Sequence, residues 1–299
     1  MNVRVVQCGK YRLRVTSWGT GGPPHAIVLP GMSADGRALA PQIRALRREM
    51  GSVHVIDLPG FVLGPALAPG DASFTQLGGY VAKAADELGI ERAVVLGHSL
   101  GGGVALYLAI DRPDLVDSLV LVAPAALGRS LHWIYKLYCI PLIGRALMRP
   151  QARMGKPFVR RFLVGSRRRV DQHFVDMLVR HGSAARDRAL SARAICWANQ
   201  PRIWRKVSLF FVPGGEQIGF ALGERLKRLA GLPTLVLWGS EDRVICVRDA
   251  ASIHHANPEA RVHIVRGYGH MLPLEAPRWT NERVVEFVRS LRPRLRRVA

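Results

Sequence analysis

The chain of 299 residues has only four cysteines, few lysines and no long hydrophobic run. The cysteines are far apart and form no Cys-x-x-Cys pair, so we interpret them as free thiols and not as a disulfide framework or a zinc site. No apolar run approaches the roughly 18–20 residues that cross a bilayer. Residues 1–6 lack the apolar core of a signal peptide. We therefore expect a cytoplasmic protein.

The common signatures of cofactor and metal binding are also missing. The sequence has no His-Glu-x-x-His pair, no phosphate-binding loop and no dinucleotide fingerprint, so we expect neither a cofactor nor a metal. Gly19, Gly21 and Gly22 run into Pro23 and Pro24, which we interpret as a hairpin connection.

Apolar and alternating runs along the chain predict an α/β fold. Residues 3–6 and 11–15 alternate as in an antiparallel hairpin. After them apolar strands alternate with helices, which is typical of a mostly parallel, doubly wound sheet. The predicted strands are 26–29, 53–57, 93–96, 118–123, 234–238 and 261–265. The predicted helices are 41–49, 75–88, 100–110, 247–256 and 279–291.

The most informative motif is Gly97-His98-Ser99-Leu100-Gly101, between an apolar run and a run of small residues. A strand, a Gly-x-Ser-x-Gly turn and a helix together form a nucleophile elbow. Such a turn strains the serine backbone, and the helix N-terminus behind it favours developing negative charge. We predict Ser99 as the nucleophile, supported by Gly97, His98 and Gly101. The alternative is that Ser99 is an ordinary small residue in a tight turn.

A serine hydroxyl needs an imidazole to take its proton and a carboxylate to orient that imidazole. Asp242 follows the strand 234–238, and His270 follows the strand 261–265 in a glycine-rich turn. Because the carboxyl ends of parallel strands gather at one edge of a sheet, we expect both side chains to lie near Ser99.

Each of these assignments has a structural alternative. Asp242 could instead cap a helix, and Glu241 and Asp249 are nearby rivals for the acid. His270 could be a turn residue without a chemical role. Asp57 closes another strand, but its Asp-Leu-Pro-Gly sequence favours a structural turn over a functional acid.

Four motifs resemble the α/β-hydrolase superfamily: residues 57–61, 97–102, 239–244 and 269–277. The similarity is to its capped branch of esterases, lactonases and carbon–carbon hydrolases. It covers roughly residues 1–124 and 231–299, and the order serine, acid, histidine also agrees with that family.

The resemblance implies an oxyanion hole built from two backbone N–H groups. One donor is expected from Leu100, directly after the nucleophile. The other is expected from the loop after strand 26–29, where family members usually carry His-Gly and this chain has Pro30-Gly31-Met32. Gly31 is kept, and the N–H of Met32 is the expected second donor.

About 106 residues separate the first half of the predicted sheet from its next strand, far more than an ordinary connection. We therefore predict a hydrolase core domain of residues 1–124 and 231–299, and a helical cap domain of residues 125–230. The superfamily commonly places such a cap over the nucleophile, where it excludes water and shapes the pocket. Residues 125–230 hold 21 Lys and Arg against five Asp and Glu, so they carry +16 of the chain's net charge of +21.

Together these features predict a serine hydrolase that cleaves a carboxylic ester, with an apolar acyl or alcohol part, through an acyl-enzyme. The alternatives are a lipase- or thioesterase-like enzyme, a carbon–carbon hydrolase, and a non-hydrolytic accessory protein of the same fold. A basic cap suits an anionic membrane surface, with the protein peripheral to it, or a phosphate-bearing acyl carrier. It equally suits a solvated surface without a partner. Nucleic acid is not expected, and the sequence leaves the oligomeric state open.

Overall fold

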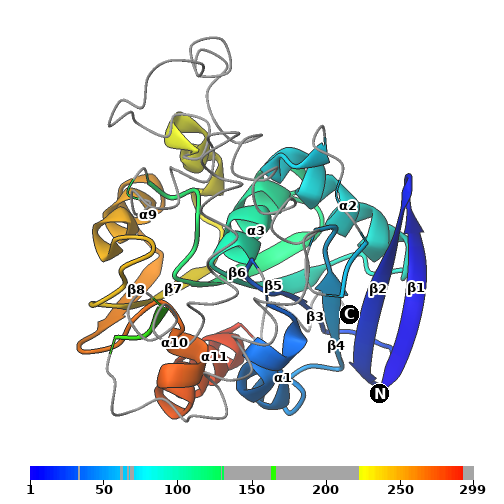
Figure 1. Ribbon diagram of the computed structural model, residues 1–299, viewed down its shortest axis with the longest axis horizontal. Helices are drawn as coiled ribbons and strands as arrows, with labels where there is room; N and C mark the ends of the chain where they lie inside the picture. The colour runs from blue at the N-terminus through cyan, green and yellow to red at the C-terminus, as the bar shows by residue number, and fades with distance from the viewer. Residues whose placement is uncertain are drawn as a thin grey trace, which may run out of the picture.

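The computed structural model describes residues 1–32, 34–60, 63–65, 67, 71–128, 130, 163–165 and 222–291. In this part of the chain the strands form one sheet, in the order β1-β2-β4-β3-β5-β6-β7-β8 (Figure 1). The strands are β1 (Asn2–Cys8), β2 (Tyr11–Gly19), β3 (His25–Leu29), β4 (Ser52–Asp57), β5 (Ala93–His98), β6 (Val116–Val122), β7 (Thr234–Gly239) and β8 (Arg261–Val265). From β4 to β8 the neighbours pair in parallel, which confirms the predicted fold class.

The prediction of a hairpin connection at residues 19–24 is wrong. β2 pairs antiparallel with β1 on one side and with β4 on the other, so this segment crosses from β2 to β3 without pairing the two. Every residue of β3 is buried. Such a strand needs a partner on each side, and it lies between β4 and β5 instead of at the edge beside β2. The glycines and prolines signalled a change of direction but not the partner strand.

Helices cover both faces of the sheet (Figure 1). On one face lie α2 (Phe74–Glu87), α3 (Leu100–Asp111) and α9 (Ala250–Ala256). On the other lie α1 (Ala40–Leu46), α10 (Leu272–Glu275) and α11 (Pro277–Ser290). Because both faces are covered, β3 to β7 are buried throughout and their sequences are rich in apolar residues.

Local sequence explains where the helices begin. α2 starts after Ser73, whose hydroxyl accepts from the backbone N–H of Gln76 while the Gln76 side chain reaches back to the N–H of Ser73. The predicted helix 247–256 is shorter in the structure, because Val247–Asp249 form a 3₁₀ turn before α9 begins. The described helices include none that is both long and apolar enough to cross a membrane.

Most of the predicted cap lies outside the described residues. The two ends of this insertion meet at the sheet, where the N–H of Leu222 donates to the carbonyl of Ala126 at 2.9 Å. The short segment 163–165 also returns to the core, beside the loop that follows β8. The division into a core and a cap domain therefore stays a prediction.

Candidate active site

Ser99 lies in the turn between β5 and α3, as the motif predicts. Its backbone has φ 54° and ψ −119°, a left-handed conformation that a non-glycine residue rarely adopts. A Cβ on Gly101 would collide with the carbonyl oxygens of Leu29 and Pro30, so that position must be glycine. The strand, the turn and the helix N-terminus thus hold the serine at the carboxyl edge of the parallel sheet.

The structure brings Ser99, His270 and Asp242 together, although they come from three separate parts of the chain. Ser99 Oγ is 2.8 Å from His270 Nε2, and His270 Nδ1 is 2.8 Å from Asp242 Oδ2. A carboxylate only accepts hydrogen bonds, so Nδ1 carries the proton and Nε2 is left to accept from the serine hydroxyl. Both His270 and Asp242 are buried. This arrangement can draw the proton from Ser99 and stabilise the imidazolium that results.

Asp242 is held by more than the histidine. Its Oδ1 accepts from the backbone N–H of Val244 at 2.8 Å and of Ile245 at 3.0 Å. Its Oδ2 also accepts from Trp238 Nε1 at 3.0 Å. Trp238 is fully buried in β7, and sequence reasoning gave it no role at the site. Its position four residues before the acid was the only signal, and an apolar strand ending in tryptophan is usually explained by packing alone.

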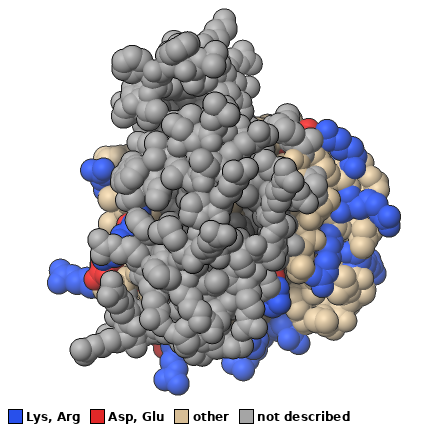
Figure 2. Space-filling view, in the orientation of Figure 1, with Lys and Arg blue, Asp and Glu red and all other residues tan. Residues whose placement is uncertain are grey.

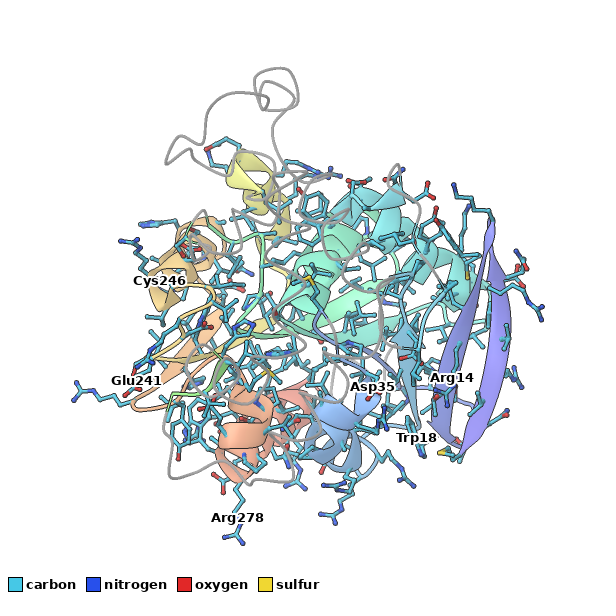
Figure 3. The ribbon with its side chains drawn as sticks, in the orientation of Figure 1. Arg14, Trp18, Asp35, Glu241, Cys246 and Arg278 are labelled. Atoms are coloured by element: carbon cyan, nitrogen blue, oxygen red, sulfur yellow. The ribbon has the colours of Figure 1, made fainter. Side chains whose placement is uncertain are left out.

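The two rival acids have other surroundings. Glu241 is exposed, and Figure 3 shows it at the outer edge of the molecule on the β7–β8 side. Asp249 is buried, but its Oδ2 accepts from both the N–H and the hydroxyl of Ser130, at 3.1 and 2.6 Å. Asp249 thus holds the start of the insertion, and Asp242 alone among the three is hydrogen-bonded to His270.

His98 contacts the neighbouring loop that carries His270, and its support of the elbow stays a prediction. Its Nε2 lies 3.0 Å from the backbone carbonyl of His270, which can only accept, so Nε2 carries the proton. Burial lowers the pKa of His98 to about 3, and the nearby His270 acts in the same direction. The ring is therefore neutral at physiological pH and serves as a fixed donor.

The loop expected to complete an oxyanion hole lies beside Ser99. A Cβ built on Gly31 would come within 3.2 Å of Ser99 Cβ, and Met32 packs against the core beside it. Leu100 is the first residue of α3, so its N–H has no acceptor within the helix. The structure therefore brings Gly31 and Leu100 close to Ser99, and Met32 follows Gly31 in the chain. The function of Leu100 and Met32 as donors stays a prediction.

Asp57 lies outside the hydrogen bonds of this site. It is buried at the end of β4 with the guanidinium of Arg14 3.7 Å away. Burial raises the pKa of Asp57 to about 6, while Arg14 opposes that shift. In Figure 3 Arg14 and Asp35 mark this region, at the β2 side of the sheet. The side chains in the described ranges include no cluster of three ligands that could hold a metal ion.

Comparison with known proteins places the chain in a family. A sequence model of the alpha/beta hydrolase fold matches residues 24–277. The chain belongs to the alpha/beta hydrolase fold family. The resemblance deduced from the four motifs is thereby confirmed, and solved structures of the same fold include meta-cleavage product hydrolases and esterases.

Individual relatives differ in what their names say they do. The acetyltransferase component of an acetoin cleaving system from Pseudomonas putida is 30% identical over 91% of this chain and 65% of its own length. A 2-hydroxy-6-oxo-6-phenylhexa-2,4-dienoate hydrolase from Burkholderia cepacia is 25% identical, over 90% of this chain and 85% of its own. A carboxylesterase from Bacillus subtilis has the same fold, with a TM-score of 0.72, 20% identity, and coverage of 96% and 91%.

The chain spans 53% and 65% of the length of the first two curated relatives it matches. The activity of those whole proteins therefore does not transfer to it directly.

Proposed function

We propose that the protein is a serine hydrolase that cleaves carboxylic esters with an apolar acyl or alcohol part. One observation supports this most strongly: the hydrogen-bonded line from Ser99 through His270 to Asp242, with 2.8 Å at both steps. Membership of the alpha/beta hydrolase fold family is consistent with it. We expect the enzyme to work without a cofactor or metal, because this line provides both the nucleophile and the base.

The proposed reaction has two halves. His270 takes the proton of Ser99 as Oγ attacks the ester carbonyl, and the N–H groups of Leu100 and Met32 stabilise the oxyanion. The tetrahedral intermediate collapses to an acyl-enzyme, and the imidazolium gives its proton to the departing alcohol. His270 then deprotonates a water molecule that attacks the acyl group, and the acid leaves as Ser99 regains its proton.

A panel of p-nitrophenyl esters of increasing acyl length tests this proposal. The wild type should hydrolyse the panel with a preference that depends on chain length. Ser99→Ala should lower kcat by at least about 10³-fold, because the remaining site only binds and polarises the carbonyl. Full activity in the alanine variant would refute the site. A folded wild type inert toward every ester, and toward the carbon–carbon hydrolase substrate described next, would favour an accessory protein.

Carbon–carbon hydrolysis is the second candidate, because the Burkholderia cepacia relative named above matches most of both chains. Such an enzyme would act on a dienoate such as the 2-hydroxy-6-oxo-6-phenylhexa-2,4-dienoate in the name of that relative, instead of on an ester. The two candidates separate when one preparation is assayed with both substrate classes. A kcat/KM for this dienoate far above that for every ester would favour carbon–carbon cleavage.

The charge of residues 125–230 supports a further variant of the proposal, in which the ester or thioester is presented by an anionic membrane or an acyl carrier. Figure 2 also shows Lys and Arg gathered on the side of the molecule where β1 and β2 lie, and residues 1–34 contain no Asp or Glu. Binding to vesicles of anionic phospholipid at low salt, and release at high salt, would support the membrane form. Salt-independent binding would count against it.

A further inference from the structure

A short piece of the insertion lies directly against the loop that carries His270. The backbone N–H of Met271 donates to the carbonyl of Leu163 at 3.0 Å. Next to this bond, Glu275 Oε2 accepts from two backbone N–H groups, of Gly165 at 2.8 Å and of Gly269 at 3.0 Å. One carboxylate oxygen thus joins the insertion to the residue that precedes the histidine.

The two glycines that Glu275 joins are in direct backbone contact. A Cβ on Gly165 would overlap the nitrogen of Gly269, and a Cβ on Gly269 would overlap the nitrogen of Gly165. On the other side, a Cβ on Gly239, at the end of β7, would overlap the carbonyl oxygens of Tyr268 and Gly269. The histidine loop is therefore enclosed between β7 and segment 163–165, with no room for an intervening side chain.

Glu275 is a buried carboxyl group whose two oxygens differ in their surroundings. It is 5% exposed, and in the part of the chain described by the structure its Oε1 has no hydrogen-bond partner. Burial raises the pKa of Glu275, while the N–H groups of Gly269 and Gly165 and the charge of His270 act in the opposite direction. A buried carboxyl is costly unless it is well hydrogen-bonded, so packing alone does not explain its presence.

We propose that Glu275 is a positioning residue that locks the His270 loop to segment 163–165 and so keeps the imidazole in line with Ser99. The inference rests on the proposed function, since it gives Glu275 its effect through His270. A negative charge at this place also favours the imidazolium that forms when His270 takes the proton of Ser99.

Two substitutions separate the hydrogen bonds from the charge. Glu275→Leu removes both acceptor bonds, and we expect kcat on a p-nitrophenyl ester to fall about 10²-fold, because small misplacements of a catalytic group carry penalties of this size. Glu275→Gln keeps an oxygen for the two N–H groups, and we expect a loss of only about 10-fold. In the glutamine variant the acid limb of the kcat/KM profile should also move to lower pH, because the charge that favours the protonated imidazole is gone.

Asp117→Asn is the matched control. Asp117 is also buried and lies near the start of β6, at the end of the parallel strands opposite to the site, where Arg92 Nε donates to it at 2.6 Å. Its replacement should lower stability and leave the acid limb in place. If Glu275→Gln behaves in the same way, or if both Glu275 variants keep wild-type kcat and pH profile, the proposal is overturned.

Amide hydrogen exchange provides a readout that does not depend on turnover. In Glu275→Leu, peptides covering 163–165 and 268–271 should exchange faster together, and unchanged exchange in both would also overturn the proposal. Failure of the proposed function looks different, because Ser99→Ala would then match the wild type. Failure of the inference alone would leave the serine-dependent activity of the wild type intact.

Discussion

Ser99 shows how a strained residue is kept in place by its neighbours. A non-glycine residue at φ 54° costs on the order of 1–3 kcal/mol. The N–H of Ser99 donates to Val122, and its carbonyl accepts from the N–H groups of Gly103 and Ala125, so β6 and α3 fix both sides of the peptide. The strain is offset by this frame, and the hydroxyl is directed toward His270.

Asp242→Asn tests how the acid orients the histidine. Oδ1 serves two backbone N–H groups, so the amide oxygen should stay with them and the amide nitrogen should face His270 Nδ1. The imidazole would then carry its proton on Nε2 and could not accept from Ser99. We expect kcat to fall about 10³–10⁴-fold with an unchanged melting temperature to within a few degrees. A variant with more than a tenth of wild-type kcat would show that the carboxylate is not needed.

Trp238→Phe tests whether the core holds the acid. Phenylalanine fills most of the same buried space but gives Asp242 Oδ2 no hydrogen bond. We expect a loss of about 1–3 kcal/mol in unfolding free energy and about a 10-fold loss in kcat, measured by urea titration and steady-state kinetics. A loss of stability without any change in kcat would restrict Trp238 to packing.

At the scale of single elements, β4 carries a histidine that responds to pH. His54 lies between Ser17 Oγ, at 2.9 Å from its Nδ1, and His25 Nδ1, at 3.3 Å from its Nε2. Burial lowers the pKa of His54 to about 4, with smaller contributions from His25 and Arg4, and burial also lowers the pKa of His25. The unfolded chain therefore binds protons more readily than the folded one below pH 6.5, and stability falls as the pH drops from there toward 4.

His54→Asn should reduce this pH dependence. The amide can replace Nδ1 toward Ser17, but it does not titrate. We expect the urea midpoint of the wild type to drop between pH 7.5 and pH 5, and that of the variant to drop clearly less, even though the variant starts from a lower stability. An equal drop in both proteins would place the acid sensitivity elsewhere.

At the scale of the whole molecule, the sequence predicted well where the strands and helices lie along the chain. Alternating runs identified β1 and β2, continuous apolar runs identified β3 to β8, and three strand ends pointed to Ser99, Asp242 and His270. The fold prediction is confirmed because periodicity is a local property of the sequence. The three side chains lie together because parallel strands share a carboxyl edge, and their catalytic roles stay predictions. The same reasoning wrongly predicted that segment 19–24 joins two paired strands. The order of strands within the sheet depends on which strands are buried on both sides, and that is not a local property of the sequence.

Other parts of the site could not be predicted because they depend on tertiary contacts. Glu275 stood in a recognised motif, but nothing in the sequence linked it to Gly165, 110 residues away. Trp238 was part of an apolar strand, and its hydrogen bond to Asp242 follows only from the folded turn. The predicted cap gave a clear length and charge signal, yet most of its residues lie outside the part of the chain that the structure describes.

The central claim is that Ser99 is an activated nucleophile because His270 and Asp242 act on it. The most direct measurement is the intact mass of the folded protein after brief treatment with a fluorophosphonate, followed by peptide mapping. The account predicts one adduct on Ser99 in the wild type, none in Ser99→Ala, and labelling slowed by at least about 10²-fold in Asp242→Asn. A folded wild type that stays unlabelled, or an adduct that forms equally fast in Ser99→Ala, would contradict it.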